Sequence, residues 1–399
     1  MHGKPWTVID LFSGVGGMSY GFHVLPNFKI VGAVDAQIAK PSGNRGALQC
    51  NRSYQANMGL EPIDADLFQL KPVELRNIVK SHLIEDRLTI LISCPPCTGF
   101  SRVIPNNHSV DDPRNSLVTR NLLFVEEFQP AIFLMENARE LIKGKFSCYY
   151  ERLRDKLTQW GYKIHEKIHF FNHYGLPQKR ERALILAVKD KLCLRTLSDL
   201  WEGYSIQKEA TYVRRAISVL PPVYAGQSDS RDPLHIAPKF TRNQSIQRLQ
   251  SIPHNGGSWA DLKDHPNAKN LLTPAMLRYI AKGDLGSHPD VYGRLWWDKP
   301  AATIKRECAH IGNGRYAHPE QDRLCTIREM SILQGFPQHY KLIASSRANI
   351  YRQIGDAVPP LISYQIARLC EWILTNKKPS IESVILPNTH LRLEDLTKV

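Results

Sequence analysis

The 399-residue chain contains no apolar run that approaches the roughly 20 residues a membrane-spanning helix needs. We also expect no signal peptide, because residues 1–6 lead directly into an apolar strand pattern. Internal repeats and low-complexity tracts are absent, and hydrophobic residues make up 42% of the chain, as in an ordinary folded protein. We therefore expect a globular protein of the cytoplasm, and the length predicts two domains.

The cysteines do not form a disulfide framework, because the eight of them are scattered along a long chain without regular spacing. Cys94 and Cys97 form a Cys-x-x-Cys pair. A zinc site would need a second pair of ligands at short spacing, and a redox motif would need a thioredoxin-like setting. The sequence has neither feature, so we expect reduced thiols and no metal.

Basic residues exceed acidic ones, 52 against 38, which gives a net charge of +14. This excess predicts attraction to polyanions, chiefly nucleic acid. Many basic proteins bind no nucleic acid, so charge alone does not identify the partner.

The first 194 residues alternate short apolar runs with helical patterns, which is typical of a parallel α/β sheet. Several of the runs are continuously apolar, as strands covered on both faces should be. The expected strands are Thr7–Leu11, Ile30–Asp35, Leu88–Ser93, Ala131–Met135 and Ala183–Val188, and the expected helices are Leu117–Phe128 and Cys148–Trp160. We predict a first domain over residues 1–194.

From about residue 195 the composition changes: Pro, Gly, Asn and His become frequent, and the apolar runs shorten. This pattern predicts a smaller, irregular domain over residues 195–340. After residue 337 helical spacing returns, notably in Leu361–Ile373, so we expect residues 341–399 to return to the first domain. Candidate nucleic-acid contacts in the irregular domain are Lys239, Arg242, Arg248, Lys263, Lys269, Arg294 and Trp259.

The first strand runs into a glycine-rich turn, Asp10–Gly17, which is followed by a helix. Such turns let a cofactor approach the backbone closely. Ser19 stands where a Gly-x-Gly-x-x-Gly motif has its third glycine, which argues against a dinucleotide. Asp35 closes the second strand, where a carboxylate can accept hydrogen bonds from ribose hydroxyls. The pair favours a nucleoside cofactor, with a purely structural turn as the alternative.

A thiol follows the strand Leu88–Ser93, in the stiff loop around Pro95, Pro96 and Cys97. Ligands of open α/β folds bind at the carboxyl ends of the strands, and a nucleophile benefits from fixed placement there. A buried, inert cysteine is the alternative interpretation.

Two more polar groups follow or precede strands of the same sheet. Glu136 and Asn137 end the fourth expected strand, and a carboxyl of raised pKa can donate to a ring nitrogen there. Arg180 and Arg182 precede the fifth strand, at alternating positions that can face one side. The alternatives are an acidic helix start and a solvated basic strand edge.

In this order the motifs resemble those of the DNA cytosine-C5 methyltransferases over nearly the whole chain. The matching segments are Asp10 to Gly17, Pro96-Cys97, Glu136-Asn137, Gln178 with Arg180 and Arg182, Arg328-Glu329 with Gln334 to Pro337, and Gln353 to Val358. The resemblance implies the Rossmann-like fold of methyltransferases that use S-adenosylmethionine (SAM), with a mostly parallel sheet and a smaller irregular target-recognition domain. It also implies double-stranded DNA as the partner and a monomeric enzyme.

The resemblance implies that Cys97 attacks C6 of a flipped cytosine and that C5 takes the methyl group from SAM. Glu136 would engage N3 and the amino group, Arg182 would hold O2, and Arg180 would help to fix the loop. A lowered pKa of the Cys97 thiol is expected, because an ordinary thiol is only slightly ionised at neutral pH. Asn137 completes the implied catalytic set.

On matching positions, the resemblance places the cofactor contacts at Phe12, Gly14, Gly16, Asp35, Asp66, Pro96 and Asp356. The expected DNA contacts are Ser101, Arg114 and Gln178, together with Lys239, Arg242 and Trp259 of the irregular domain. Three residues depart from the family pattern. Thr98 replaces a Gln, Ala36 an aromatic residue, and Asp356 an Asn. An extra loop is expected at residues 40–43.

Two other functions remain open at this stage. A tRNA cytosine-C5 methyltransferase would use the same chemistry, although the Cys-Phe-Thr signature expected of that branch is absent from this sequence. A catalytically silent DNA-binding regulator would not need Cys97, Glu136, Arg180 and Arg182. The compact chain suggests DNA modification within a restriction or anti-phage system, acting at a short DNA sequence and associated with the nucleoid through that DNA.

Overall fold

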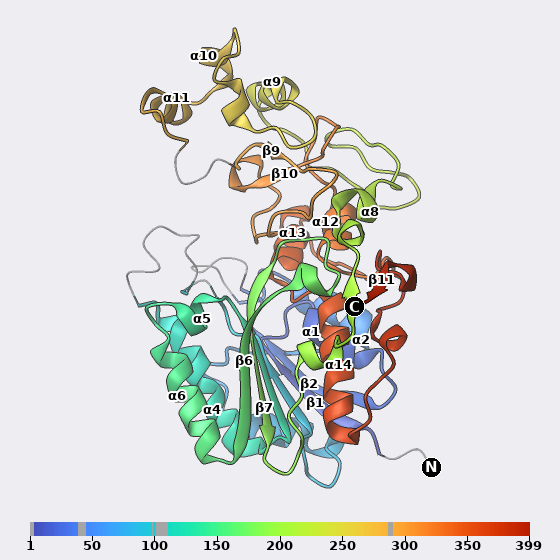
Figure 1. Ribbon diagram of the computed structural model, residues 1–399. Coiled ribbons are helices and arrows are strands. Elements are labelled where there is room, and N and C mark those ends of the chain that lie inside the picture. Colours follow the sequence, from blue (N-terminus) through green and yellow to red (C-terminus); the bar gives the residue numbers. More distant parts are fainter. Residues whose placement is uncertain (1–3, 39–44, 98, 101–110, 286–289) are drawn as a thin grey trace.

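The computed structural model describes residues 4–38, 45–97, 99–100, 111–285 and 290–399. Its centre is a seven-stranded sheet in the order β3-β2-β1-β4-β5-β7-β6 (Figure 1). The strands are β1 Trp6–Leu11, β2 Phe28–Asp35, β3 Ile63–Asp64, β4 Ile90–Ser93, β5 Ile132–Asn137, β6 Tyr162–Phe170 and β7 Glu181–Lys189. The first five run parallel, and β7 pairs antiparallel with both β5 and β6. The predicted mostly parallel α/β sheet is confirmed.

The five expected strands are present, but the sequence analysis missed β3 and β6. β3 has only two residues. β6 is an edge strand in which Lys, His and Glu residues are interspersed among apolar ones, and most of its residues are partly buried or exposed. A strand of this kind lacks the continuous apolar run that marks the central strands.

Helices cover both faces of the sheet because successive strand residues point to opposite sides. Ile90 and Ile92 of β4 join the core beneath α1 (Gly17–His23) and α14 (Pro360–Thr375). Leu91 joins the other core, under α3 (Pro72–Val79), α4 (Leu117–Phe128) and α6 (Cys148–Gln159). The remaining helices of this part are α2 Cys50–Met58, α5 Glu140–Lys143, α7 Leu197–Leu200, α12 Ile327–Leu333 and α13 Arg347–Asp356.

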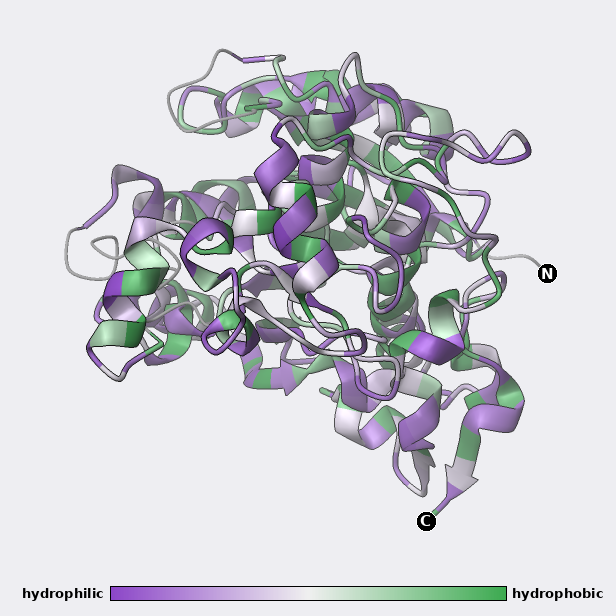
Figure 2. Cartoon of the chain, turned by 90° about the horizontal axis from the view of Figure 1, so that it is seen from above, coloured by the Kyte–Doolittle hydropathy of each residue, from purple (hydrophilic) through white to green (hydrophobic). Residues whose placement is uncertain are grey.

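A smaller lobe stands beyond the carboxyl ends of the central strands (Figure 1). It contains α8 Val213–Ile217, α9 Asn243–Ser251, α10 Ala268–Leu271, α11 Pro274–Ala281, β9 Gly293–Arg294 and β10 Arg315–Ala317. Its outer part has a separate apolar core around Trp259 and Leu262. Viewed from above, individual helices carry hydrophobic and hydrophilic positions side by side, as expected when one helix face packs on a core (Figure 2).

The segment after residue 194 contacts α14 and the end of the chain before it reaches the small lobe. Trp201 donates a hydrogen bond to Gln365 of α14 at 3.0 Å. β8 (Tyr204–Ile206) pairs antiparallel with β11 (Leu396–Lys398) near the end of the chain. Among the helices of the described residues, none is long and apolar enough to cross a membrane.

A buried ion pair supports the junction between the two lobes. Both guanidinium Nη atoms of Arg323 donate to Glu329, at 2.7 and 2.8 Å, and both side chains are 1% exposed. The carboxylate also accepts from the backbone N–H of Thr326. These hydrogen bonds and the charge of Arg323 outweigh the cost of burial and lower the pKa of Glu329 to about 2.

We predict that Glu329→Gln destabilises the protein by about 3–5 kcal/mol at neutral pH, because Arg323 loses its counter-charge inside the protein. The pKa of Glu329 is lower in the folded chain than its ordinary value of about 4.3. Its stabilisation is therefore complete above that ordinary value and is lost as the pH falls towards 2. Urea unfolding measures both effects. Glu85→Gln, at the exposed Lys4–Glu85 pair, is the control and should leave the unfolding midpoint unchanged.

Candidate active site

The sequence motifs converge because the strands that precede them are parallel and in register. Leu11 at the end of β1 pairs with Val34 of β2 on one side and with Ser93 of β4 on the other. Ser93 in turn pairs with Met135 of β5. The glycine-rich turn, Asp35, the Cys97 loop and Glu136 therefore lie at one edge of the sheet, as expected for a ligand site of an α/β protein.

Glycines of the first turn allow backbone contacts that other residues would block. Gly16 has a φ of 87°, and a Cβ there would lie 2.8 Å from the Met58 Cε. A Cβ on Gly17 would lie 2.1 Å from the carbonyl oxygen of Val358. The turn is thus closely packed against α2 and against the segment that follows α13.

Asp35 is held at the end of β2 by two backbone amides. The N–H of Gly14 donates to its Oδ2 at 2.8 Å, and the N–H of Gln37 donates to its Oδ1 at 2.6 Å. Burial raises the pKa of this carboxyl, and the two amides oppose that effect. Its fixed position beside the glycine turn suits the ribose contact that the family resemblance implies.

The turn offers unsatisfied polar groups and space for a cofactor. Among the described residues, the buried Oγ of Ser13 and Oδ1 of Asp10 have no hydrogen-bond partner. A Cβ on Gly14, where φ is 52°, would meet no atom within 4 Å. A ligand with hydroxyl and amino groups, such as SAM, fits these donors and acceptors.

Ser19, which interrupts the glycine motif, has a structural role. Its hydroxyl donates to Asp10 Oδ2 at 2.6 Å and lies 2.8 Å from the Tyr54 hydroxyl. Burial raises the pKa of Asp10 to about 7, although the Ser19 hydrogen bond lowers it. This polar network lies beneath the turn, and the sequence analysis did not find it.

The remaining cofactor candidates lie at or just beyond the ends of other strands and helices. Phe12 has a φ of 61° at the start of the turn. Asp66 follows β3 and accepts a hydrogen bond from the Phe68 N–H at 2.9 Å. Pro96 is exposed beside Cys97, and Asp356 ends α13.

Asn137 fixes the loop that carries Cys97. Its Nδ2 donates to the carbonyl oxygen of Pro95 at 3.0 Å, and its Oδ1 accepts from the Ala138 N–H at 2.8 Å. The side chain is 2% exposed. Asn137 is therefore placed to position the loop, whereas Cys97 itself is only partly buried.

The local charges act on Cys97 in opposite directions. Burial raises the pKa of its thiol, Arg182 and Arg180 lower it, and Glu136 and Asp356 raise it. The net direction is upward, so the expectation of a lowered pKa is wrong for this arrangement of the site. The reason is that the cost of burying a thiolate exceeds the stabilisation that the two arginines provide.

Glu136 and Arg182 form an ion pair next to this thiol. Arg182 Nε lies 3.1 Å from Glu136 Oε1, and the two side chains are 16% and 9% exposed. The same Oε1 has no hydrogen-bond partner among the described residues, so the contact is electrostatic rather than a directed hydrogen bond. Glu136 therefore keeps hydrogen-bonding capacity for a ligand.

Arg180 connects separate segments behind the site. Its Nη1 donates to the carbonyl oxygen of Ile304 at 3.3 Å, and its Nη2 donates to that of Ala357 at 3.2 Å. Burial lowers its pKa to about 9, so it remains protonated at neutral pH. It contributes positive charge near Cys97 and joins the small lobe to the end of α13.

Several expected DNA contacts are wrong because the side chains are enclosed by protein. Gln178 is fully buried, with its Nε2 donating to Gln334 Oε1 at 2.7 Å and its Oε1 accepting from the Ile304 N–H at 2.9 Å. Trp259 is 1% exposed, in the outer core of the small lobe. Arg248 and Arg294 are also buried and donate to backbone carbonyl groups.

The other candidate contacts differ in their placement. Lys239, Arg242, Lys263 and Lys269 are exposed. Arg114 is partly buried and forms an ion pair with Asp112. Ser101, Thr98 and the expected extra loop at residues 40–43 lie outside the described residues.

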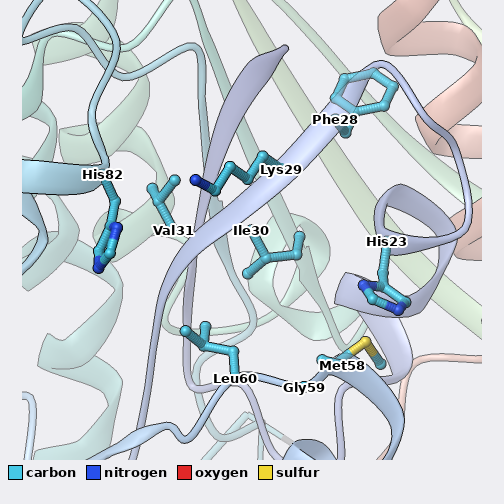
Figure 3. Close-up of a pocket in the computed structure, with 9 residues that line it drawn as sticks. All are labelled: His23, Phe28, Lys29, Ile30, Val31, Met58, Gly59, Leu60 and His82. Atoms are coloured by element: carbon cyan, nitrogen blue, oxygen red, sulfur yellow. The ribbon is translucent and has the colours of Figure 1, made fainter.

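A pocket of about 400 Å³ lies elsewhere, at the beginning of β2 (Figure 3). It is lined by His23, Phe28, Lys29, Ile30, Val31, Met58, Gly59, Leu60 and His82. Phe28 begins β2, whereas Asp35 ends it. The pocket is therefore separated from the Cys97 edge by the length of this strand. Within the described residues, no group of three or more His, Cys, Asp or Glu side chains is arranged to hold a metal ion.

We predict that Arg182→Met shifts alkylation of Cys97 by iodoacetamide to higher pH, because the methionine removes the cation that most lowers its pKa. Mass spectrometry of the Cys97 peptide across a pH series gives the profile. Arg139→Met is the matched control, since Arg139 pairs with Glu181 and should leave the profile unchanged. An unchanged or lowered profile in Arg182→Met would contradict the assigned electrostatics.

Known proteins match this chain over most of its length. Type II methylase M.HgiDII of Herpetosiphon aurantiacus is 30% identical over 367 residues, which cover 91% of this chain and 94% of that protein. Type II methyltransferase M.DdeI of Desulfomicrobium norvegicum is 26% identical over 400 residues, covering 93% and 89%.

Comparison with solved structures supports the fold. The crystal structure of S. pombe Dnmt2 methyltransferase matches 92% of this chain and 99% of its own, with a TM-score of 0.58 and 18% identity. The model of the C-5 cytosine-specific DNA methylase family matches residues 6–372. The chain therefore belongs to the C-5 cytosine-specific DNA methylase family, whose members use S-adenosylmethionine as the methyl donor.

Proposed function

We propose that this enzyme methylates cytosine at C5 within a short DNA sequence, with Cys97 as the nucleophile. The observation that carries the proposal is the arrangement of Cys97, Glu136 and Arg182 at the same sheet edge as the glycine turn. A cytosine inside a duplex cannot reach these groups, so it must be flipped out of the helix. SAM supplies the methyl group as an electrophile.

Cys97 acts first in the proposed mechanism. Its thiolate forms a bond to C6 of the flipped cytosine, and the electron pair of the C5–C6 double bond becomes available at C5. Arg180 and Arg182 favour the thiolate, which opposes the effect of burial. C5 then takes the methyl group, and S-adenosylhomocysteine is left as the second product. When the C5 proton is lost, the electron pair of the C5–H bond restores the C5–C6 double bond, and the C6–S bond breaks to return its electron pair to Cys97.

Glu136 and Arg182 hold the base during these steps. Glu136 engages N3 and the exocyclic amine of the cytosine, which stabilises the charge that develops on the ring. Arg182 holds both Glu136 and the cytosine O2. This role uses the Glu136 oxygen that keeps its hydrogen-bonding capacity.

We assign the cofactor to the glycine turn and its surroundings. Phe12, Gly14, Gly16, Asp35, Asp66, Pro96 and Asp356 are the proposed SAM contacts. Ser13 and Asp10 offer further unpartnered oxygen atoms near the turn. Because the turn residues and Cys97 follow adjacent parallel strands, the methyl donor and the base meet at one edge of the sheet.

We assign target recognition to residues 195–340. Lys239 and Arg242 are exposed and are the proposed phosphate contacts, while residues 1–194 carry the chemistry and residues 341–399 complete the large lobe. We further propose that the enzyme acts as a monomer in the cytoplasm, bound to the nucleoid, within a restriction or anti-phage system. The named type II methylases among its relatives support that setting.

The decisive experiment is bisulfite sequencing of plasmid DNA and total RNA from a host without its own cytosine methylation. Wild type should protect cytosine at one short DNA motif, Cys97→Ala should protect none, and Glu136→Gln should lower protection by about 10²-fold or more. Cys148→Ala, at an exposed thiol, is the matched control and should behave as wild type. Protection of a tRNA position alone would favour RNA, and no protection by folded wild type would favour the silent regulator.

Binding of duplex DNA tests the recognition segment separately. Lys239→Ala and Arg242→Ala should each weaken binding to any sequence and reduce the slope of log affinity against log salt by about 0.9, as expected for one lost phosphate contact. Fluorescence anisotropy over a salt series measures the slope. Lys29→Ala, in the pocket at the opposite end of β2, is the control with an unchanged slope. An unchanged slope in both test variants would remove these residues from the interface.

A further inference from the structure

Arg306, which lies outside the family motifs, joins two segments that border the proposed cofactor site. Arg306 Nη1 forms an ion pair with Asp356, and Nη2 donates to the carbonyl oxygen of Ile38 at 2.6 Å. Asp356 stands where the family pattern has a neutral asparagine. The departure at position 356 therefore comes with a partner of opposite charge, fifty positions away in the sequence.

The backbone around Arg306 is fixed by close contacts. A Cβ on Gly355 would lie 2.4 Å from the carbonyl oxygen of Lys305 and 2.7 Å from the Arg306 Cα. The last turn of α13 therefore packs directly on the Lys305–Arg306 backbone. Arg180 holds the adjoining segment through the carbonyl oxygen of Ile304. Arg306 is consequently anchored at its base as well as at its guanidinium group.

Arg306 connects two sides of the cofactor site. Ile38 comes three positions after Asp35, the proposed ribose contact. Asp356 precedes Val358, whose carbonyl oxygen lies against Gly17 at the end of the glycine turn. The side chains of Arg306 and Asp356 are 28% and 37% exposed, so a ligand can approach the pair.

The pair controls the local charge. Burial raises the pKa of both Asp35 and Asp356, and Arg306 lowers both. The negative charge of Asp35 also raises the pKa of Asp356. With Arg306 and Asp356 both charged, the pair adds no net charge and resembles a neutral asparagine. Removal of either member would leave a net charge beside the site.

We propose that the Arg306–Asp356 pair sets how strongly the enzyme prefers SAM over its product, S-adenosylhomocysteine (SAH). SAM carries a sulfonium cation and SAH a neutral sulfur, so a net charge near the site changes the affinity for SAM more than that for SAH. The inference rests on the proposed function, which places SAM at this site. Arg306 and Asp356 act as specificity residues that do not take part in the bond changes.

Calorimetric titration of SAM and SAH into the full chain, without DNA, tests the proposal through the ratio of the two Kd values. Asp356→Asn leaves Arg306 without this counter-charge and should reduce the preference for SAM about five- to tenfold at low salt. Arg306→Gln leaves Asp356 unbalanced and should raise that preference by a similar factor. The double variant should return to the wild-type ratio.

Two controls separate charge from structural support. Arg306→Lys keeps the charge but loses the bridge to Ile38, so both affinities should fall while their ratio stays constant. Raising the salt concentration should shrink the shifts in both single variants, because the pair is partly exposed. A variant that only loosens the structure of the cofactor site would change the Kd values of SAM and SAH by the same factor.

The result also distinguishes this inference from the proposed function. If the wild type binds both ligands and every variant has the same Kd ratio, the charge role is overturned while the methylation mechanism stands. If the wild type binds neither ligand, the placement of SAM at this site is overturned as well. Shifts of the same sign in both single variants would equally contradict the charge-matching role.

Discussion

Parallel pairing of β1 with β2 on one side and β4 on the other determines where everything else in the site can lie. The pairing brings the ends of these strands into register, and β5 continues it on the far side of β4. The residues that follow each strand must then share one edge of the sheet. This backbone geometry holds together the glycine turn, Asp35, Cys97 and Glu136, without direct contacts among all of them.

Burial gives the site its electrostatic character. Low polarity around Cys97 and Glu136 raises the cost of each isolated charge, and it also makes nearby guanidinium groups more effective. The Cys97 thiol is consequently protonated at rest, with two arginines poised to stabilise its ionised form. The proposed mechanism needs the thiolate only when a flipped cytosine is bound, so that the thiolate can attack its C6.

Close backbone contacts hold the cofactor region to the end of the chain. Gly17 accommodates Val358, Gly21 accommodates Ser363 of α14, and Gly355 accommodates Lys305. Any side chain at these positions would separate segments that lie far apart in the sequence. Arg180 and Arg306 complete the junction through carbonyl groups at Ile304, Ala357 and Ile38. The C-terminal segments are therefore part of the proposed site's architecture, although they supply few of its reactive groups.

The sequence alone was enough to predict the five inner strands of the sheet, because they contain apolar runs with polar residues at their ends, but it did not predict the edge strands β3 and β6. It also predicted that Cys97 and Glu136 lie close together, since parallel strands place their carboxyl ends at one edge. Arg182 reaches Glu136 because β7 runs antiparallel to β5 and begins at this edge. Asn137 was predicted as a member of the site from the family resemblance, and its hydrogen bond to the Pro95 carbonyl became visible only in the structure.

Tertiary structure decided which polar and aromatic residues reach a surface. Four residues of types that often contact DNA are enclosed by protein: Gln178, Arg248, Trp259 and Arg294. Residue type cannot reveal this, because a buried arginine with carbonyl partners and an exposed one look identical in a sequence. The Arg306–Asp356 pair was equally hidden, because it depends on how α13 packs against a segment fifty residues earlier. Local pattern determined the elements and their ends, and long-range packing determined which side chains meet there.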